Sequence, residues 1–398
     1  MLRTTAICTG VSLITLLGSY LFGCGSDETE VVADQTGKVW PARPDGAPTG
    51  DGPGWVFAVD KLYLGDTDRN EIGSATAWKD YGYNLDGKIS TKESTDLCQP
   101  FTGGSKALVY PDGTNGIDNV FGKVLMSLIT SFAADATAQV NENIAEGSFT
   151  LIIRMDNLGD GASYVDIPGF LYAGVQLVDG AGEDAMPNWD GNDEWPVAPE
   201  LLDSPPDLDS SQVKFPTSYV NNNTWVSGTP DDLDLSLSIQ GFNLTLVITN
   251  AIVTMDLDPT RANGATNGTI AGVIEVEPMI ESLRSIAGSF SEALCEGTTF
   301  DSLADSLRQG ADILSTCDSS VAGSCQNPSE TCNAISIGLG FSVKPIAWPS
   351  PVADPSPPQG DPCAQGGGGS GGSSSSGTGG STGGAGGAGG AGGAGGAG

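Results

Sequence analysis

The fold is decided by the stretch Ile335-Ser336-Ile337-Gly338-Leu339-Gly340-Phe341-Ser342-Val343, in which every second side chain is large and apolar. Ser and Gly occupy the positions between them. Successive side chains of a β-strand point to opposite faces of a sheet, so this alternation is typical of a strand whose apolar face covers a core.

Comparable patterns recur along the chain. Residues 232–240 alternate Leu or Ile with Asp and Ser, and a second alternating run after Gly241 predicts a hairpin partner at 244–248. Further apolar runs predict strands at 55–59, 148–153, 170–178 and 269–276. Many short strands favour a mainly β fold, and we expect an antiparallel β-sandwich or a jelly-roll-like body.

A few helices should pack at one side of this body. The longest predicted helix covers 117–140, where Val120, Val124 and Leu128 recur at helical spacing. Other helical patterns lie at 74–81, 278–290 and 300–314.

Composition divides the 398 residues into segments. Residues 24–53 are rich in Gly, Pro and Asp and are predicted to form a flexible tether. Residues 54–363 are predicted to form a single body, with 54–100 as a candidate calcium-loop submodule and the acidic, Pro-rich 179–209 as a surface excursion. Residues 364–398 are low in complexity, rich in Gly, Ser and Ala, and should be disordered.

The first 23 residues have the features of an export signal. Arg3 provides a positive start, and an apolar run ends at Leu21-Phe22-Gly23-Cys24. This tetrapeptide resembles the cleavage site of bacterial lipoprotein signals, which implies cleavage before Cys24 and acylation of its thiol. The alternative is a plain secretory signal with a chance Cys. Gly25 stands where inner-membrane lipoproteins carry Asp, so the resemblance implies an outer-membrane or cell-surface location.

The body is also similar to bacterial surface lipoproteins to which no activity is assigned. The likeness lies in Ala77-Trp78-Lys79-Asp80-Tyr81-Gly82-Tyr83-Asn84-Leu85-Asp86-Gly87 and in Cys332-Asn333-Ala334-Ile335-Ser336-Ile337-Gly338. It implies a location and no chemistry.

The charge excludes several classes of function. A formal net charge of −33 and a pI near 4.1 argue against nucleic-acid binding, which needs Lys and Arg at the phosphates. They also argue against adsorption to anionic lipids, so the acyl anchor must hold the protein at the membrane. The chain contains no His, which excludes a Ser-His-Asp triad, a Cys-His pair and His-ligated metal sites.

Six cysteines remain after the leader and Cys24 are set aside: Cys98, Cys295, Cys317, Cys325, Cys332 and Cys363. An even number in an exported chain predicts three disulfides. We expect Cys295 to pair with Cys332, Cys317 with Cys325, and Cys98 with Cys363. A metal cluster is the weaker alternative, because the chain has no C-x-x-C motif.

Residues 82–93 resemble the twelve-residue calcium loop of EF-hand and dockerin families. Asn84, Asp86, Ser90 and Glu93 fall on loop positions 3, 5, 9 and 12, and Gly87 falls on position 6. The resemblance implies calcium bound by these oxygen-bearing side chains.

Position 1 of this loop is Gly82 instead of Asp. Asp80 or the nearby Asp66-Thr67-Asp68-Arg69-Asn70 segment is a candidate for the missing ligand, so the predicted calcium residues are Asp66, Asp68, Asn84, Asp86 and Glu93. The alternative is a turn at 84–87 followed by a capping box from Ser90 to Glu93.

A second candidate site is the loop Trp189-Asp190-Gly191-Asn192-Asp193-Glu194-Trp195. Indole faces stack on sugar rings, and carboxylates or amides bind hydroxyls, so Trp189, Asp190, Asn192, Asp193 and Trp195 form a candidate glycan site. The alternative is a turn whose two Trp side chains pack into the body.

Together these features favour a lipid-anchored envelope protein of binding or structural type over an enzyme. A carbohydrate-binding domain, or a glycan-active domain using a pair of carboxylates, is the alternative function. The expected partners are the membrane through the anchor and a glycan or another envelope protein, and the sequence does not indicate an oligomeric state.

Overall fold

The computed structural model describes residues 37–355, except for 133–134, 229–230, 240–241, 291–294, 296 and 322. For 131–132, 231–232, 234–239, 242–245 and 285–290 it describes the backbone alone. Cys24, Cys363, the leader and the Gly-rich tail lie outside the described residues.

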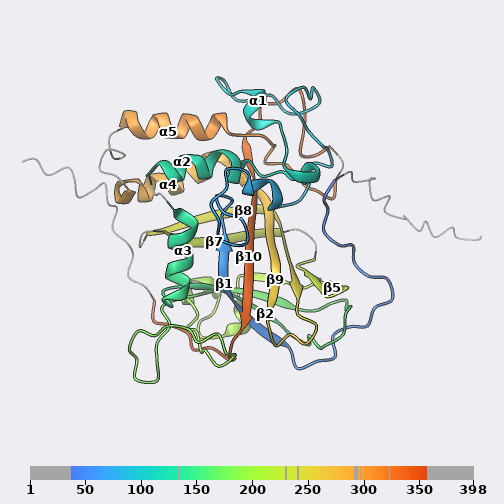
Figure 1. Ribbon diagram of the computed structural model, residues 1–398, viewed down its shortest axis with the longest axis vertical. Helices are drawn as coiled ribbons and strands as arrows, with labels where there is room; N and C mark the ends of the chain where they lie inside the picture. Colours follow the sequence, from blue (N-terminus) through green and yellow to red (C-terminus); the bar gives the residue numbers. More distant parts are fainter. Residues whose placement is uncertain are drawn as a thin grey trace, which may run out of the picture.

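The body is mainly β, as predicted, and its strands form one curled antiparallel sheet (Figure 1). Nine strands follow one another in the order β4-β3-β2-β1-β10-β9-β8-β6-β5, and β7 pairs with β8 as a hairpin. The strands are β1 (Trp55–Tyr63), β2 (Thr150–Met155), β3 (Gly169–Gly174), β4 (Val213–Phe215), β5 (Tyr219–Asn221), β6 (Thr224–Val226), β7 (Asp231–Ile239), β8 (Phe242–Leu257), β9 (Ala265–Glu275) and β10 (Ala334–Pro345).

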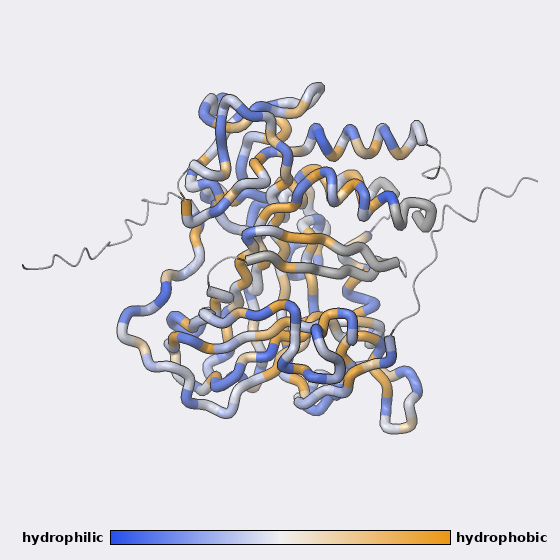
Figure 2. Tube along the Cα trace, turned by 180° about the vertical axis from the view of Figure 1, so that it is seen from behind, coloured by the Kyte–Doolittle hydropathy of each residue, from blue (hydrophilic) through white to orange (hydrophobic). Residues whose placement is uncertain are grey.

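Strand β10 lies in the middle of this order and forms part of the core. Its five alternating apolar side chains, Ile335, Ile337, Leu339, Phe341 and Val343, are each at most 2% exposed and belong to the largest hydrophobic cluster. Figure 2 shows runs of hydrophobic residues along the strands, between more hydrophilic loops.

The curled sheet encloses a filled interior. Val59, Leu151, Ile153, Leu171, Leu233, Val253, Ile270 and Phe341 come from seven strands and line a void of only about 10 Å³. A single water needs at least about 10–15 Å³, so this interior is a packed core and not a ligand cavity.

The helices gather mainly at one end of the sheet (Figure 1). The longer ones are α2 (Met126–Phe132), α3 (Ala136–Ala145), α4 (Val276–Phe290) and α5 (Gly297–Gln309), and the short ones are α1 (Lys106–Val109), η1 (Ala77–Asp80), η2 (Thr114–Gly116), η3 (Phe121–Leu125), η4 (Pro199–Leu201) and η5 (Leu208–Ser210). Among the described residues, no helix combines the length and apolar character that a membrane crossing requires.

The single helix predicted for 117–140 is wrong. A turn of π-helix at η3 leads into α2, and Asp135 adopts a left-handed backbone (φ +62°) directly before α3. A left-handed residue cannot continue a right-handed helix, so the chain changes direction there and α3 packs along β1 and β7.

Part of the predicted tether belongs to the body, because residues 37–53 are bound along it. Lys38 donates its N–H to the Asn115 carbonyl at 2.8 Å, Arg43 forms an ion pair with Asp166 at 2.7 Å, and Thr49 forms a β-bridge with Val165. Figure 1 shows this segment running down one side of the molecule before it enters β1.

One disulfide fastens the loop before α1 to the segment before β10, and a second closes a short loop within that segment. Cys317 pairs with Cys325, as predicted, whereas Cys98 pairs with Cys332. The predicted pairs Cys295–Cys332 and Cys98–Cys363 are therefore wrong. Cys295 is also disulfide-bonded, with its partner outside the described residues. The sequence offered no means of choosing among the pairings, because partners 234 positions apart meet only in the folded chain.

Candidate cation site beside the central strand

The candidate site lies on the face of β10 opposite to the main core. A Cβ at Gly338 would stand 2.3 Å from the Tyr81 carbonyl oxygen, so glycine is needed for this close approach of the loop after η1. Asn119 fixes the contact, since its Oδ1 accepts the Gly338 N–H at 3.0 Å and its Nδ2 donates to the Gly338 carbonyl at 2.8 Å.

Four carboxyl groups gather around this contact. They come from the loop after η1, the turn after α1, the turn after η2, and the turn between α5 and β10: Asp86, Asp112, Asp118 and Asp312. Asp118 is only 6% exposed and Asp312 only 7%. Carboxylates are rarely buried to this extent unless another group compensates their charge.

Backbone and hydroxyl donors hold each carboxyl in place. Asp118 accepts the N–H groups of Leu85 and Asp86 on Oδ2, at 2.7 and 3.3 Å. Asp112 accepts the N–H of Ser90.

Asp312 is bound by the neighbouring strand. It accepts the Ser336 N–H at 2.9 Å and the Ser336 hydroxyl at 2.7 Å, and Ser336 Oγ in turn accepts the N–H of Val120 at 2.9 Å. This chain of hydrogen bonds connects β10 to the start of η3.

The surroundings favour the neutral form of all four carboxyls. Burial is the main cause in each case: it raises the pKa of Asp112 to about 8 and that of Asp312 to about 7, and it raises the pKa values of Asp86 and Asp118. Neighbouring carboxylates add to the effect, and Asp86 is the charge with the largest influence on the pKa of Asp118.

Two lysines lie near the cluster, and both are engaged. Lys88 forms an ion pair with Asp96, and Lys123 donates to the Pro111 carbonyl at 2.8 Å. Burial lowers the pKa of Lys123, which is partly offset by Asp312 and Asp112. Asp118 itself forms no ion pair with Lys or Arg in the part of the chain that the structure describes.

Asp86 Oδ2 and Ser90 Oγ, in the predicted calcium loop, are buried and have no hydrogen-bond partner among the described residues. The other oxygen of Asp86 accepts the Lys88 N–H at 2.8 Å, and the Gln326 amide lies near the carboxylate without forming a regular hydrogen bond to Oδ2. Ser90 is only 7% exposed. Buried polar atoms are nearly always satisfied, so these two oxygens require an explanation.

No three acidic, Cys or His side chains stand close enough together to hold a metal ion, within the residues that the structure describes. A cation beside Asp86 would therefore need amide, hydroxyl or backbone oxygens as well as carboxylates. Asn84 and Ser90 supply such groups, and calcium accepts them as ligands.

The remaining predicted calcium residues have other contacts. Asp66 accepts the Thr137 hydroxyl of α3, and Asp68 accepts the N–H groups of Asn70 and Ile72 in its own turn, at 2.8 and 3.0 Å. Glu93 is on the surface, with a side chain 81% exposed. The side chains of Asn84 and Asp86 are both hydrogen-bonded to the Lys88 backbone, and Ser90 follows in the same loop. Asp66 and Asp68 have their contacts elsewhere, and Glu93 lies on the surface.

The Trp189–Trp195 loop is folded around Asp193. Asp193 accepts the N–H groups of Asn188 and Trp189 at 2.9 and 2.8 Å, and the two indole rings lie 6.1 Å apart. Trp195 is fully buried, so no sugar can stack on it in this conformation, while Asp190 remains on the surface.

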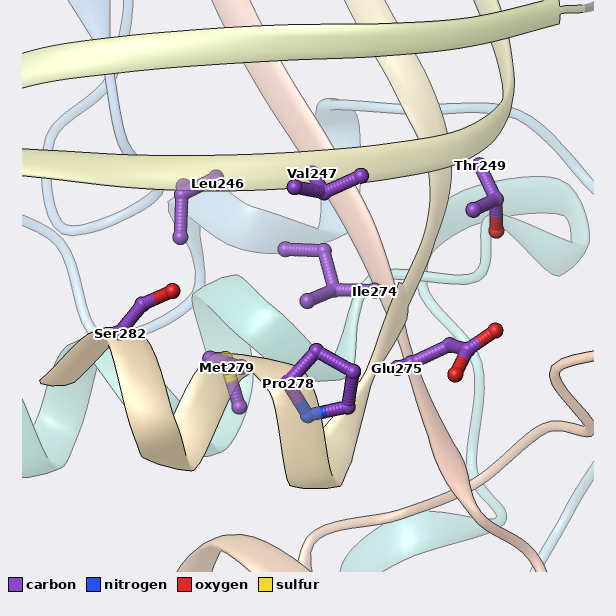
Figure 3. A pocket seen from close by; sticks show the side chains of 8 residues that line it. All are labelled: Leu246, Val247, Thr249, Ile274, Glu275, Pro278, Met279 and Ser282. Carbon is purple, nitrogen blue, oxygen red and sulfur yellow. The ribbon is translucent and has the colours of Figure 1, made fainter.

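Apolar grooves flank the helices. The groove in Figure 3 has a volume of about 210 Å³ and lies between β8 and α4, where Leu246 and Val247 face Pro278 and Met279. Glu275 is the one charged residue among those that line this groove.

Three members of the carboxyl cluster, Asp112, Asp118 and Asp312, were missed by the sequence reasoning. Each stands alone in its segment and no motif marks it. The only signal was the loop 82–93, whose missing first ligand indicated that a carboxylate had to come from elsewhere.

Comparison with known proteins gives no functional lead: no family model, curated protein or solved structure matches this chain.

Proposed function

We propose that this protein is a lipid-anchored, calcium-binding component of a bacterial cell envelope, of binding or structural type. The main support for the calcium site is the pair of buried oxygens, Asp86 Oδ2 and Ser90 Oγ, that lack a hydrogen-bond partner among the described residues. Both belong to a loop whose sequence resembles a calcium loop, and both lie near a cluster of buried carboxyl groups.

The chemistry of the site favours calcium over other ions. The available ligands are carboxylate, amide, hydroxyl and backbone oxygens, which are the ligands of hard cations. Magnesium demands a tighter octahedral arrangement than such a dispersed set offers, whereas calcium accepts six to eight oxygens in flexible geometry. Because many of these ligands would be neutral, we expect a dissociation constant of about 10⁻⁴–10⁻³ M.

Calcium is expected to stabilise the folded protein. At ten times the dissociation constant, an ion that binds only the folded state adds about 1.4 kcal/mol, which is roughly 2–4 °C in melting temperature. The measurement is thermal unfolding in millimolar calcium and in chelator, with magnesium as the ionic control.

Two variants make this test specific. Asp86→Ala should abolish the calcium-dependent increase, while Asp68→Ala should retain it, because Asp68 lies in a separate turn. An unchanged melting temperature of the wild type in calcium, or an equal increase in Asp86→Ala, would contradict the calcium site.

The membrane anchor is proposed from the leader and Cys24. A diacylated Cys with a further acyl chain binds a bilayer firmly, whereas a single chain binds only marginally. Gly25 favours the outer membrane or the cell surface as the location.

Replacing Cys24 by Ser should release the protein from membranes. The thiol is the group that would carry the lipid, and the strongly acidic chain has little attraction to anionic headgroups. The measurement is the distribution of the protein between membrane and soluble fractions, with Cys8→Ser in the leader as the matched control. Tight membrane association of Cys24→Ser would refute the anchor.

A further inference from the structure

The loop 82–93 lacks its own first ligand for a structural reason. Gly82 has a φ of +113°, and a Cβ there would stand 3.1 Å from Ile117 Cγ2 and 3.3 Å from the Asp118 carbonyl oxygen. An Asp at this position would therefore be strained in its backbone and crowded by its neighbours. The carboxylate that position 1 normally supplies has to come from another segment.

We infer that Asp118 supplies this carboxylate and binds the same cation as Asp86. This inference rests on the proposed calcium site and names a ligand from outside the loop.

The hydrogen bonds place Asp118 at the loop. Its Oδ2 accepts the N–H groups of Leu85 and Asp86, which are loop positions 4 and 5, and its own N–H donates to the Tyr83 carbonyl at 3.0 Å. Residues on both sides of Asn84 are thus bound to Asp118. A carboxylate has about four acceptor sites, so two hydrogen bonds on Oδ2 leave Oδ1 available for a cation.

The charges around Asp118 favour the binding of a cation. Asp118 is 6% exposed and has no ion pair with Lys or Arg among the described residues, and the charge with the largest influence on its pKa is another carboxylate, that of Asp86. A buried carboxylate in such surroundings must either hold a proton or face a cation. A calcium ion between Asp86 and Asp118 would also engage the unpartnered Asp86 Oδ2, and it requires no third carboxylate.

The other candidates for the missing ligand are engaged elsewhere. Asp80 Oδ1 accepts the Thr114 hydroxyl at 2.8 Å, and Asp66 is bound to Thr137. Asp112 accepts the N–H of Ser90, whereas Asp118 accepts the N–H of Asp86 itself.

The test is calcium titration calorimetry of Asp118→Asn. Asn keeps an acceptor for the Leu85 and Asp86 N–H groups and removes the charge, so the variant should fold, with a dissociation constant for calcium at least tenfold higher than that of the wild type. Glu93→Gln is the matched control, because Glu93 belongs to the loop but lies on the surface, and its affinity should stay within twofold.

The outcomes separate the two proposals. Absence of calcium binding by the wild type would overturn the calcium site itself. Binding by the wild type with equal affinity in Asp118→Asn, or a larger loss in Glu93→Gln, would overturn the role of Asp118 alone.

A measurement without mutation covers the case in which Asp118→Asn does not fold. In carboxyl-labelled wild-type protein, the carboxyl carbon resonances of Asp118 and Asp86 should shift together during a calcium titration. A shift of Asp86 without a shift of Asp118 would refute the inference.

Discussion

Replacing Cys98 and Cys332 together by Ala is expected to lower the free energy of unfolding by about 5 kcal/mol, in the chain-entropy description of a disulfide. The reason is the length of chain between them, since 234 positions separate the two cysteines. A cross-link over such a distance removes many conformations from the unfolded chain. The measurement is urea denaturation under non-reducing conditions.

The Cys317–Cys325 pair provides the matched control. It closes only eight positions and should contribute about 2.5 kcal/mol by the same relation. Both pairs are buried, so replacement by Ala removes similar side-chain atoms, and the difference between the two double variants reports the length of the closed chain. Equal losses, or a larger loss for Cys317 and Cys325, would contradict this account.

The free energy of unfolding is expected to fall as the pH rises from about 4 to about 7, with Asp312 contributing about 4 kcal/mol to the decrease. Burial raises the pKa of Asp312 to about 7, well above the value near 3.8 of an unfolded Asp. Between these two values the folded state keeps the proton while the unfolded state loses it, so a rising pH favours unfolding. Below pH 4 and above pH 7 this contribution is constant.

Asp312→Asn isolates the effect. The amide keeps an acceptor for the Ser336 N–H but does not titrate, so the variant should lose about 4 kcal/mol less than the wild type over the same pH range. Denaturant unfolding at pH 4, 5.5 and 7 provides the measurement, with the exposed Asp190→Asn as the control. Parallel stability profiles for wild type and Asp312→Asn would show that Asp312 is ionised in the folded protein at low pH.

Local patterns predicted the strands well. The alternation at 335–343 indicated a strand with an apolar face, and the runs at 232–240 and 244–248 predicted the hairpin that β7 and β8 form. These patterns are local, because the side chains of one strand alternate whatever its neighbours are. The order of the strands depends on long-range pairing, such as that of β1 with β10, and the sequence did not reveal it.

The positions where helices break and where the folded body begins were harder to predict than the strands. Apolar residues continue at helical spacing through 117–140, yet the chain turns at Asp135 because α3 packs against β1 and β7. The polar composition of 24–53 predicted a tether, but backbone hydrogen bonds bind its part 37–53 to the body.

Only part of the candidate site could be predicted from the sequence. Asn84, Asp86 and Ser90 form a pattern because they lie within one loop. The fold brings Asp112, Asp118 and Asp312 to the loop from other segments of the chain. Their role depends on burial, and with 49 acidic residues in the sequence nothing indicates which of them are buried.

If Cys24 carries the proposed anchor, the attachment of Lys38 to the body would set the orientation of the protein at a membrane. Its N–H and carbonyl bind Asn115 and Asn84, so the described part of the chain begins beside the carboxyl cluster. Gly37 lies 13 positions after Cys24, and an extended chain spans at most about 45 Å over that distance. With Cys24 acylated, the body would be attached to the membrane at the end that carries the carboxyl cluster. Anionic headgroups attract counter-ions, so that end would meet more calcium than the opposite end of the sheet.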